Sequence, residues 1–428
     1  MRRSQLFIKT RKDVPSDEVA LNAQLLIRGG FVHKEMAGVY DFLPLGLAVL
    51  NKIIEIIRQE MNAIGGQEVY LSGLQPKDNW EKSGRWHDDV VDVWFKTRTH
   101  GAKGFHLGPE LGLGNTHEEA ITAIARGHIS SYKDLPTYVY QFQTKYRNEP
   151  RAKSGLLRCR EFIMKDLYSF SGSQAQHDKF YEEVKVAYGK IFKRLGLSDS
   201  TYLTYASGGS FSKFSHEFQT LLPVGEDTVF VDKKKKMAVN KDVITDDVLT
   251  DLGLKKADLK EAKAVEVGNI FPLGTRFSKP LGLNFVDRAG QNKSVVMGSY
   301  GIGPGRVMGV IAERFADKSG LVWPEAVAPF MVYLVSIGDD SSIRKAAQDI
   351  YSQLTAAGVS VLYDDRDERA GEKFADADLL GLPYRVVVSE KLIKNNQVEL
   401  KARTSQTPKE VKHDQLVETL VGTLVKTL

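Results

Sequence analysis

Cysteine is nearly absent from this sequence, and long apolar runs are missing. The 428 residues include a single cysteine, Cys159, which excludes an internal disulfide framework and fits a reducing cytoplasm. Cationic neighbours would lower the pKa of this thiol, but the favoured interpretation is a small strand residue without a chemical role. No apolar segment follows Met1, and no run reaches about 18 apolar residues. We therefore predict a cytoplasmic protein with neither a signal peptide nor a membrane partner.

A strong excess of either charge is also missing. The net charge is +5, and 42% hydrophobic with 26% charged residues is typical of a globular protein long enough for two or three domains. The charge is nevertheless uneven. Residues 328–428 contain 13 Lys+Arg and 15 Asp+Glu, which leaves 46 and 39 for the rest of the chain. Attraction for a polyanion is therefore expected mainly from the N-terminal part, whereas the C-terminal part would read its ligand by shape and hydrogen bonds.

A basic stretch at residues 146–170 carries the first functional signal. It mixes carboxylates and aromatic residues with four arginines, namely Arg147, Arg151, Arg158 and Arg160. Strand-like runs at 138–143 and 156–164 flank the turn-forming triplet 153–155, which predicts an antiparallel hairpin with alternate arginines on one face. Arginine suits phosphate because its planar fork donates two parallel hydrogen bonds. A phosphate-binding hairpin is therefore favoured over an ordinary solvated one.

Residues 138–170 resemble motif 2 of class II aminoacyl-tRNA synthetases, in the form found in prolyl-tRNA synthetases. Motif 1 is matched at 44–76, where apolar residues at helical spacing precede a strand-like run at 67–72 and Pro76. Motif 3 is matched at 295–313 by a strand-like run, a glycine-rich bend and a helix that carries an arginine near its start. Since motif 1 forms the dimer interface of that class, the resemblance implies a homodimer.

Shorter segments extend the resemblance along the chain. Residues 79–86 are similar to a stretch of prolyl and threonyl enzymes, and Thr116-His117-Glu118 matches the Thr-x-Glu loop that holds the ammonium group of the amino acid in the prolyl family. A hydroxyl and a carboxylate suit a secondary ammonium, because that group offers two N–H donors and one positive charge.

Three departures from the prolyl pattern are visible. Asn269 replaces the histidine in a segment that otherwise resembles Glu-Val-Gly-His-Ile-Phe, so a proton-dependent role at this position is not expected. Ser299 stands where many members have cysteine. Pro304-Gly305 replaces a hydrophobic residue followed by Ser or Thr.

The motifs imply an α+β catalytic domain of the class II type at 1–327, with helices flanking an antiparallel sheet. A C-terminal α/β anticodon-binding domain is implied at 328–428, because strand-like and helix-like runs alternate there and residues 364–383 are similar to that domain in related enzymes. The other predicted elements are a helix at 19–28 capped by residues 15–18, a helix beginning near 120, a helix at 178–195, a linker at 323–330, strands at 331–337, 359–363 and 385–388, and helices at 341–357 and 374–380.

Carried over by motif, the resemblance implies a site for L-proline and ATP. The proline-binding residues would be Thr116, Glu118, Arg147, Met164, Asp166, Tyr168, Phe271 and Ser299. The ATP-binding residues would be Arg147, Glu149, Leu157, Arg158, Phe162, Glu266, Asn269 and Arg306. Arg147 and Arg306 are the implied catalytic residues, and Glu266 is the implied ligand of a Mg²⁺ ion that arrives with ATP. The implied anticodon contacts are Arg366, Glu368, Arg369 and Lys373.

The implied activity is that of a prolyl-tRNA synthetase, which forms prolyl-adenylate from L-proline and ATP and transfers the prolyl group to tRNA(Pro). Residues 242–266 leave room for one or two helices, whereas many bacterial members carry an editing domain there, and a domain needs about 50 residues. We therefore expect a short form without this insertion. Because a missing methylene is worth only about 1–3 kcal/mol, such an enzyme would activate alanine and depend on a separate trans-editing protein.

Two other interpretations remain. A synthetase-like protein that binds nucleic acid without catalysis could lose Arg147, Glu149 or Arg306, but all three are present. A threonine-specific synthetase would need a zinc site of cysteine and histidine, which a single cysteine disfavours. The pair His216-Glu217 does not complete an HExxH motif because position 220 is threonine, so no structural zinc is expected.

Overall fold

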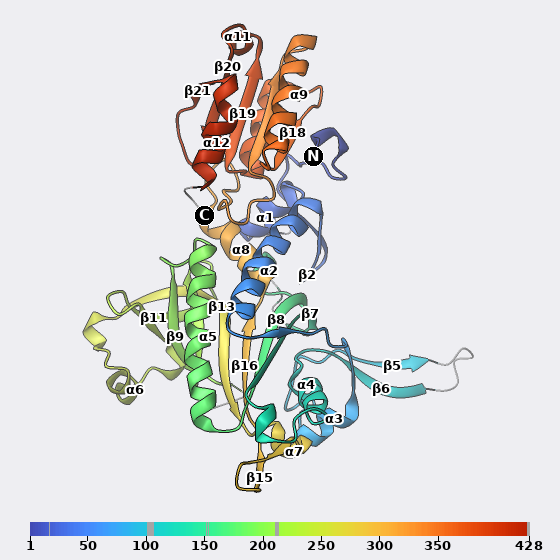
Figure 1. Ribbon diagram of the computed structural model, residues 1–428, viewed down its shortest axis with the longest axis vertical. Helices are drawn as coiled ribbons and strands as arrows, with labels where there is room; N and C mark the ends of the chain where they lie inside the picture. The colour runs from blue at the N-terminus through green and yellow to red at the C-terminus, as the bar shows by residue number, and fades with distance from the viewer. Residues whose placement is uncertain (17, 101–106, 151, 153, 210–213, 426–428) are drawn as a thin grey trace. The chain divides into compact units, whose positions relative to one another are not determined.

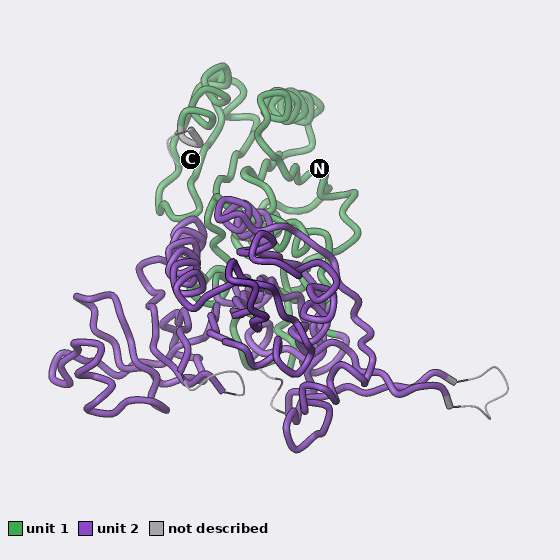
Figure 2. Tube along the Cα trace, turned by 60° about the horizontal axis from the view of Figure 1, so that its bottom comes forward, with its two compact units in different colours: residues 1–34, 41–52, 311–428 green, residues 35–40, 53–310 purple. Residues whose placement is uncertain are grey.

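The structure is a computed structural model that describes residues 1–428 except 17, 101–106, 151, 153, 210–213 and 426–428 (Figure 1). The chain forms two compact units (Figure 2). Unit 1 comprises residues 1–34, 41–52 and 311–428, and unit 2 comprises residues 35–40 and 53–310. The helices α2 (Pro44–Ala63) and α8 (Pro304–Phe315) each contribute residues to both units. The division into domains at 1–327 and 328–428 stays a prediction.

A nine-stranded, mostly antiparallel sheet forms the centre of unit 2. Its order is β10-β9-β12-β11-β13-β16-β8-β7-β3, and β10 also pairs with β13. The strands are β3 (Gln67–Glu68), β7 (Thr137–Tyr146), β8 (Glu161–Ser171), β9 (Thr201–Ser207), β10 (Phe214–Leu221), β11 (Asp227–Asp232), β12 (Met237–Asn240), β13 (Lys260–Gly274) and β16 (Val296–Ile302). The pair β7–β8 is the antiparallel hairpin predicted for the basic stretch.

Helix α5 (Gln174–Arg194) runs along the strands of this sheet, as Figure 1 shows. Its buried residues Phe180, Val184, Tyr188 and Ile191 recur at helical spacing and therefore lie on one face. The hydroxyl of Ser173 caps the helix by accepting a hydrogen bond from the backbone N–H of Gln176 at 3.3 Å. The helix predicted at 178–195 is thus confirmed, with an earlier start.

Smaller elements complete unit 2. The three-stranded sheet β4-β6-β5 and the hairpin β14–β15 lie outside the central sheet. These elements and the remaining helices of the unit are β4 (Leu74–Pro76), α3 (Lys77–Ser83), β5 (Lys96–His100), β6 (Leu107–Leu113), α4 (Glu118–Ala125), η2 (Tyr132–Asp134), η3 (Gly155–Leu157), η4 (Lys241–Val243), α6 (Asp246–Asp251), η5 (Lys256–Asp258), α7 (Ser278–Leu281), β14 (Asn284–Val286) and β15 (Asn292–Ser294). Between β12 and β13 the chain forms only the short helices η4, α6 and η5, so no inserted domain occurs there.

Unit 1 contains a five-stranded sheet in the order β18-β17-β19-β20-β21, and α9 packs on β17, β18 and β19. Its elements are η1 (Arg3–Gln5), α1 (Leu21–Arg28), β17 (Val332–Ile337), α9 (Ser341–Ala356), β18 (Val361–Asp364), α10 (Ala370–Leu380), β19 (Tyr384–Ser389), α11 (Glu390–Lys394), β20 (Gln397–Ala402), β21 (Lys409–Lys412), η6 (His413–Gln415) and α12 (Leu416–Val425). The strands β1 (Val32–Met36) and β2 (Val39–Phe42) lie where the chain passes from one unit to the other. The alternation predicted from residue 331 onward is confirmed, because β17, β18 and β19 are parallel neighbours connected through helices.

Four local predictions were wrong. Helix α1 begins at Leu21 after Ala20, which provides no side-chain cap, so residues 15–18 do not cap it. The strand predicted at 67–72 ends at Glu68. Farther on, the N–H of Leu71 donates to the side-chain oxygen of Gln141 at 3.0 Å instead of to a strand backbone. Residues 156–160 do not form a strand, because Ser154 and Gly155 have φ angles of 73° and 63° that turn the chain into η3. The segment predicted as a linker at 323–330 is packed, since Trp323, Val327 and Ala328 are buried.

Among the described residues, none of the helices combines the length and the apolar character needed to cross a bilayer.

Candidate active site

One face of the central sheet carries most of the predicted site residues. The register sets Phe271 opposite Ser299 and Ser299 opposite Tyr168, in one row across β13, β16 and β8. The next row sets Asn269 opposite Gly301 and Gly301 opposite Asp166. Because directly opposed residues and residues two apart share a face of a sheet, Met164 and Phe162 follow Asp166 on the same side. Residues scattered over more than 100 positions in sequence thus lie together.

Two local features shape this face. A β-bulge at residue 267 of β13 leaves Gln219 opposite Glu266 while Phe218 stays opposite Gly268. The extra residue changes the alternation, so Glu266 and Asn269 point to the same side although they are three apart. The amide of Asn269 donates to Glu266 Oε1 at 2.7 Å. A Cβ at position 301 would lie 2.7 Å from Asn269 Oδ1, so a larger residue there would displace the Asn269 side chain.

The loop before α4 supplies a buried carboxylate, Glu118, which is 2% exposed. The hydroxyl of Thr116 donates to its Oε2, and the hydroxyl of Ser299 donates to its Oε1 at 3.0 Å. The guanidinium of Arg85 is 3.9 Å from Glu118 but only 2.9 Å from Glu119. Glu118 is therefore a buried anion held by neutral donors, and its nearest cation is engaged elsewhere. Such a carboxylate favours a cationic ligand, since an unpaired buried charge is costly.

Arg85 and Glu119 form the layer behind this carboxylate, and neither was predicted as a site residue. Arg85 also lies over the ring of Trp80 at 5.1 Å, and Ser83 donates to Glu119 at 2.8 Å. Burial raises the pKa of Glu119 to about 7 even though Arg85 opposes the shift. Residues 79–86, which include Arg85, are similar in sequence to a stretch of related enzymes, but no function was predicted for them.

Asp166 is fully partnered inside the sheet. It accepts hydrogen bonds from Lys145 at 2.8 Å, from Gln141 at 2.8 Å and from the hydroxyl of Tyr168 at 2.9 Å. Burial lowers the pKa of Lys145, whereas the neighbouring Asp166 favours its charged form. Burial also raises the pKa of Tyr168 well above its ordinary value, so its phenol stays a donor. Asp166 thus fixes the orientation of Tyr168, while the unpredicted residues Lys145 and Gln141 complete the network.

Arg147 joins the hairpin to the loop that carries Glu118. Its Nε donates to the backbone carbonyl of Asn115 at 3.1 Å, and its guanidinium lies over the ring of Phe162 at 5.4 Å. Burial and the positive charge of Arg306 lower the pKa of Arg147. Two arginines are therefore close enough to repel each other, an arrangement that an anion between them would relieve.

The arginines of the basic hairpin lie at positions other than those predicted. Arg147, Arg158 and Arg160 lie in the connection between β7 and β8 rather than alternating on a strand, and Arg151 lies outside the described residues. Arg158 pairs with Glu149 at 2.8 Å and also with Glu226. Leu157 is buried in η3, and its side chain approaches the position of Gly309. The arginines are thus grouped around the end of the hairpin.

Cys159 lies in the same connection. Burial raises the pKa of its thiol to about 12, against the lowering that cationic neighbours would produce. The thiol is therefore protonated and unreactive at neutral pH. The interpretation without a chemical role agrees with this, although the residue is not part of a strand.

Carboxylates gather beside Arg306 at the far side of the face. Arg306 donates to the backbone carbonyl of Glu266 at 2.9 Å, and its guanidinium is 3.4 Å from the Glu266 carboxylate. Burial and the nearby Glu266 raise the pKa of Glu217 to about 8, and burial also raises the pKa of Asp227. Oxygen ligands of this kind are those that Mg²⁺ prefers. The Glu266 carboxylate is of this chemical kind, but Asn269 and Arg306 are already partners of its two oxygens, so its role as a Mg²⁺ ligand stays a prediction.

The four predicted anticodon residues lie in unit 1, next to the end of β18. Arg366 donates to both oxygens of buried Asp364, at 2.8 and 2.7 Å, and to Asp376 at 2.7 Å. Lys373 is buried and donates to the carbonyl of Ser336 at 2.9 Å. Glu368 and Arg369 are exposed. All except Arg369 line one cavity of about 340 Å³.

The sequence matches two family models. Residues 105–315 match the model described as "tRNA synthetase class II core domain (G, H, P, S and T)", and residues 331–423 match the "Anticodon binding domain". A prolyl-tRNA synthetase of Cryptosporidium parvum, solved with halofuginone and AMPPNP, superposes with a TM-score of 0.78 at 18% identity, over 95% of this chain and 77% of that chain. At that identity the likeness concerns the fold alone. Fold and family matches together define a class II aminoacyl-tRNA synthetase.

Two more similar proteins narrow this class. A proline--tRNA ligase of Azorhizobium caulinodans is 38% identical over 448 residues, covering 99% of this chain and all of that protein. One of Zymomonas mobilis is 39% identical over 429 residues, covering 95% of each. The chain belongs to the proline--tRNA ligase family. Its activity is therefore the ATP-dependent ligation of proline to tRNA.

Proposed function

We propose that Glu118 holds the ammonium group of L-proline, assisted by Thr116 and Ser299, and that Arg147 bridges the proline carboxylate and the α-phosphate of ATP. The observation that carries this proposal is the burial of the Glu118 carboxylate between two hydroxyl donors, with its nearest cation paired to Glu119. A secondary ammonium would supply the missing positive charge. The contact of Arg147 with the carbonyl of Asn115 supports a position next to the same ligand.

The remaining residues of the face divide between the two substrates. Phe271, Met164 and Tyr168 would border the apolar ring of proline, and Asp166 acts there through the hydroxyl of Tyr168. At the other side Glu149 would meet the adenine amino group, while Phe162 and Arg306 would enclose the adenine ring. Leu157 and Arg158 line the nucleotide site in this assignment. Arg158 and Arg306 are about one-third exposed and form ion pairs with carboxylates, which supports a place for a polyanion because phosphate can replace those partners.

The reaction is an in-line attack. A carboxylate oxygen of proline attacks the α-phosphorus of ATP, the bond to the β-phosphate breaks, and prolyl-adenylate and pyrophosphate form. The terminal adenosine hydroxyl of tRNA(Pro) then attacks the acyl carbon and AMP leaves. Two anions must meet in the first step, so positioning and fixed positive charge from Arg147 and Arg306 dominate. Glu266, with Asn269 holding its other oxygen, is the proposed ligand of Mg²⁺, which would neutralise phosphate charge when bound with ATP.

The same pocket is proposed to accept alanine and to lack any correction within this chain. The ligase of Geobacillus sp. is 33% identical over 570 aligned residues, so at least 142 of its aligned positions (570 − 428) have no counterpart here. Short helices alone fill the stretch between β12 and β13. Both facts support a short form that depends on a separate trans-editing protein, since an apolar pocket rejects a smaller ligand by only about 1–3 kcal/mol.

Amino-acid-dependent ATP–pyrophosphate exchange tests the site. L-Proline should support strong exchange, alanine weak exchange and threonine none. Incubation of alanyl-tRNA(Pro) with the purified protein should leave most of the ester intact, and rapid hydrolysis would contradict the editing part. Failure of proline to support exchange would contradict the assignment of the whole face.

A homodimer through motif 1 is proposed as well, in a cytoplasmic enzyme. In the part of α2 that belongs to unit 2, Ile53, Ile57 and Met61 are buried within the chain. The segment after the helix exposes Tyr70 and Leu74. Exposed apolar side chains of this size are typical of an interface. Replacement of Tyr70 by aspartate should shift the sedimentation coefficient toward that of a monomer.

For unit 1, we propose that residues 328–428 bind the anticodon of tRNA(Pro) around the cavity next to β18. Glu368 and Arg369 are exposed for direct contact, whereas Arg366 and Lys373 are held by protein groups and would shape the cavity.

A further inference from the structure

The cavity next to β18 in unit 1 has a wall that comes from the other end of the chain. Residues 1–12, here called the N-terminal arm, reach this cavity, and Arg2 forms a parallel bridge with Tyr363 of β18. Figure 1 shows the start of the chain beside β18. The predicted anticodon residues were all taken from 364–383, and Arg2 was not among them.

Arg2 is held in a defined position. Its guanidinium donates to Asp365 at 3.2 Å and to the side-chain oxygen of Gln348, and it lies 5.4 Å from the centre of the Tyr363 ring. The ring itself is buried, whereas the Arg2 side chain is 34% exposed. The guanidinium therefore lies over the aromatic ring, and both residues line the cavity.

The arm also holds the loop that follows β18. Asp365 accepts hydrogen bonds from the backbone N–H of Ser4 at 2.9 Å and from its hydroxyl at 2.7 Å. On the opposite side Arg366 is clamped between Asp364 and Asp376. Both sides of the loop are thus tied to protein groups, which fixes the rim of the cavity before any ligand arrives.

The charges of the cavity favour a nucleobase over a phosphate group. Its lining includes four cations and four carboxylates: Arg2, Arg344, Arg366 and Lys373 against Asp339, Asp365, Asp367 and Glu368. A balanced set offers donors and acceptors but little attraction for an anion. Unstacked RNA bases are bound by stacking on aromatic rings or guanidinium planes, with hydrogen bonds to their edges.

We propose that Arg2 is a tRNA-contacting residue whose guanidinium, supported by Tyr363, is the platform on which one unstacked anticodon base lies. This inference rests on the proposed binding of the anticodon by this part of unit 1 and adds the N-terminal arm to the site.

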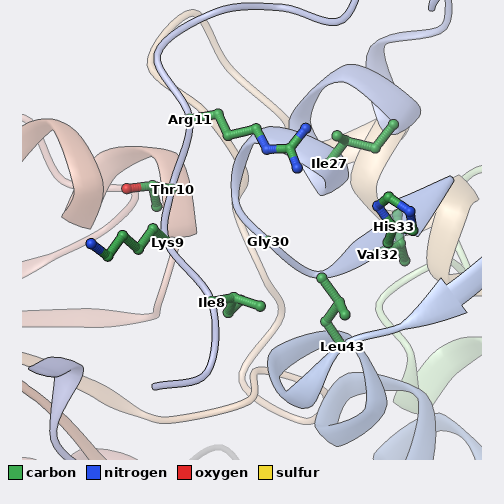
Figure 3. Close-up of a pocket in the computed structure, with 9 residues that line it drawn as sticks. All are labelled: Ile8, Lys9, Thr10, Arg11, Ile27, Gly30, Val32, His33 and Leu43. Carbon is green, nitrogen blue, oxygen red and sulfur yellow. The ribbon is translucent and has the colours of Figure 1, made fainter. Parts of the chain in front are cut away.

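Replacement of Arg2 leaves the rest of the arm attached. Thr10 donates to Asp376 at 2.6 Å, and the N–H of Arg11 donates to the carbonyl of Arg28 at 2.8 Å. Residues 8–11 also wall a second cavity, of about 270 Å³, against the end of α1 and β1 (Figure 3). These contacts do not involve Arg2, so the variant Arg2→Ala should keep its fold.

The test combines protein variants with tRNA(Pro) transcripts that each lack one anticodon base. For the unaltered protein, loss of the stacked base should raise the KM for tRNA roughly tenfold, as expected for one base–side-chain stack. Arg2→Ala should raise the KM for intact tRNA by a similar factor, and loss of that base should cost the variant nothing more. The kcat of aminoacylation and proline-dependent ATP–pyrophosphate exchange should stay unchanged.

Two variants sharpen the result. Arg2→Lys keeps the charge beside Asp365 but has no planar face, so it should behave like Arg2→Ala, and behaviour like the unaltered protein would overturn the stacking role. Lys12→Ala is the control, because Lys12 belongs to the same arm but pairs with Glu372 outside the cavity and should have no effect.

The outcomes separate the two hypotheses. If base removal affects the unaltered protein and Arg2→Ala by the same factor, the inference about Arg2 is overturned and anticodon binding stands. If no missing anticodon base changes the KM of the unaltered protein, the proposed anticodon site fails and the inference fails with it.

Discussion

The two ends of the active-site face use charge in opposite ways. At the closed end, formed by Thr116, Glu118 and Ser299, a buried carboxylate accepts hydrogen bonds from two hydroxyls, and Arg85 lies closer to Glu119 than to this carboxylate. At the open end, formed by Glu149, Arg158 and Arg306, arginines that are about one-third exposed are already paired with carboxylates. A small ligand with one positive charge needs a preformed anion, whereas a polyanion can displace weak ion pairs. The closed end should therefore be sensitive to single substitutions and the open end tolerant of them.

The largest effect is expected at Arg147, which joins the two ends. Arg147→Ala should lower the rate of proline activation by about 10²–10³ or more, because a fixed donor to the reacting groups is lost. Proline-dependent ATP–pyrophosphate exchange under saturating substrates measures this rate. Arg147→Lys should recover little, since one ammonium cannot replace a two-pronged donor. Near-normal exchange in Arg147→Ala would refute its assignment.

The closed end is tested by Glu118→Gln, which keeps the shape and removes the charge. The KM for proline should rise roughly 10- to 100-fold, in line with about 1.5–3 kcal/mol for a hydrogen bond to a charged group. The KM for ATP should not change. Glu119→Gln is the matched control, because this neighbour is equally buried but is directed to Arg85, and its effect on the KM for proline should be smaller. Equal effects of the two variants would mean that Glu118 has no special role.

The pH dependence of stability tests whether the loop at the closed end is buried away from water. Burial, and secondarily Lys145, lower the pKa of His117 to about 4, against 6.5 for an unperturbed histidine. The unfolded chain thus binds more protons between pH 6.5 and 4, so the free energy of unfolding should fall as the pH drops through this window, by roughly 2 kcal/mol at pH 5. Urea unfolding of unit 2 at pH 7.5 and 5.0 measures the loss. His117→Gln should lose less stability between the two pH values, and an equal loss would show that His117 titrates normally.

The residues of the closed end were predicted better from the sequence than the ion pairs that surround them. Thr116 and Glu118 were recognised because residues 116–118 match the Thr-x-Glu loop of the prolyl family. Ser299, Tyr168 and Phe271 were assigned by motif, and the structure brings them into one row through strand register. Register depends on pairing between distant segments, so periodicity alone could not have given it.

The residues that were missed depend on contacts between remote segments. Arg85 and Glu119 form an ion pair across 34 positions, and Lys145 and Asp166 form one across two strands. The bulge at residue 267, which turns Glu266 toward Asn269, was not predicted, although Gly268 beside it is a residue that often marks a bulge. The positive φ of Ser154 and Gly155 likewise replaced the expected strand at 156–160 by a turn. Most helices and strands were predictable from local pattern, whereas the ion pairs and the strand register depend on contacts between remote segments.

The smallest effect is expected at the open end and has the opposite sign. Glu226 pairs with Arg158, and the two side chains are 40% and 35% exposed. An ion pair this exposed stabilises the protein by only about 0.2–1 kcal/mol. Glu226→Gln removes one of the two carboxylates that pair with Arg158 and leaves Glu149, so Arg158 should bind phosphate more readily. The KM for ATP should fall about two- to threefold at low salt, with less change at high salt. Glu60→Gln is the control, because Glu60 pairs with Arg194 instead of with a residue of the active-site face. A KM for ATP that rises would mean that Glu226 holds Arg158 in place for the nucleotide. The open end would then be preorganised like the closed end, and the contrast between them would disappear.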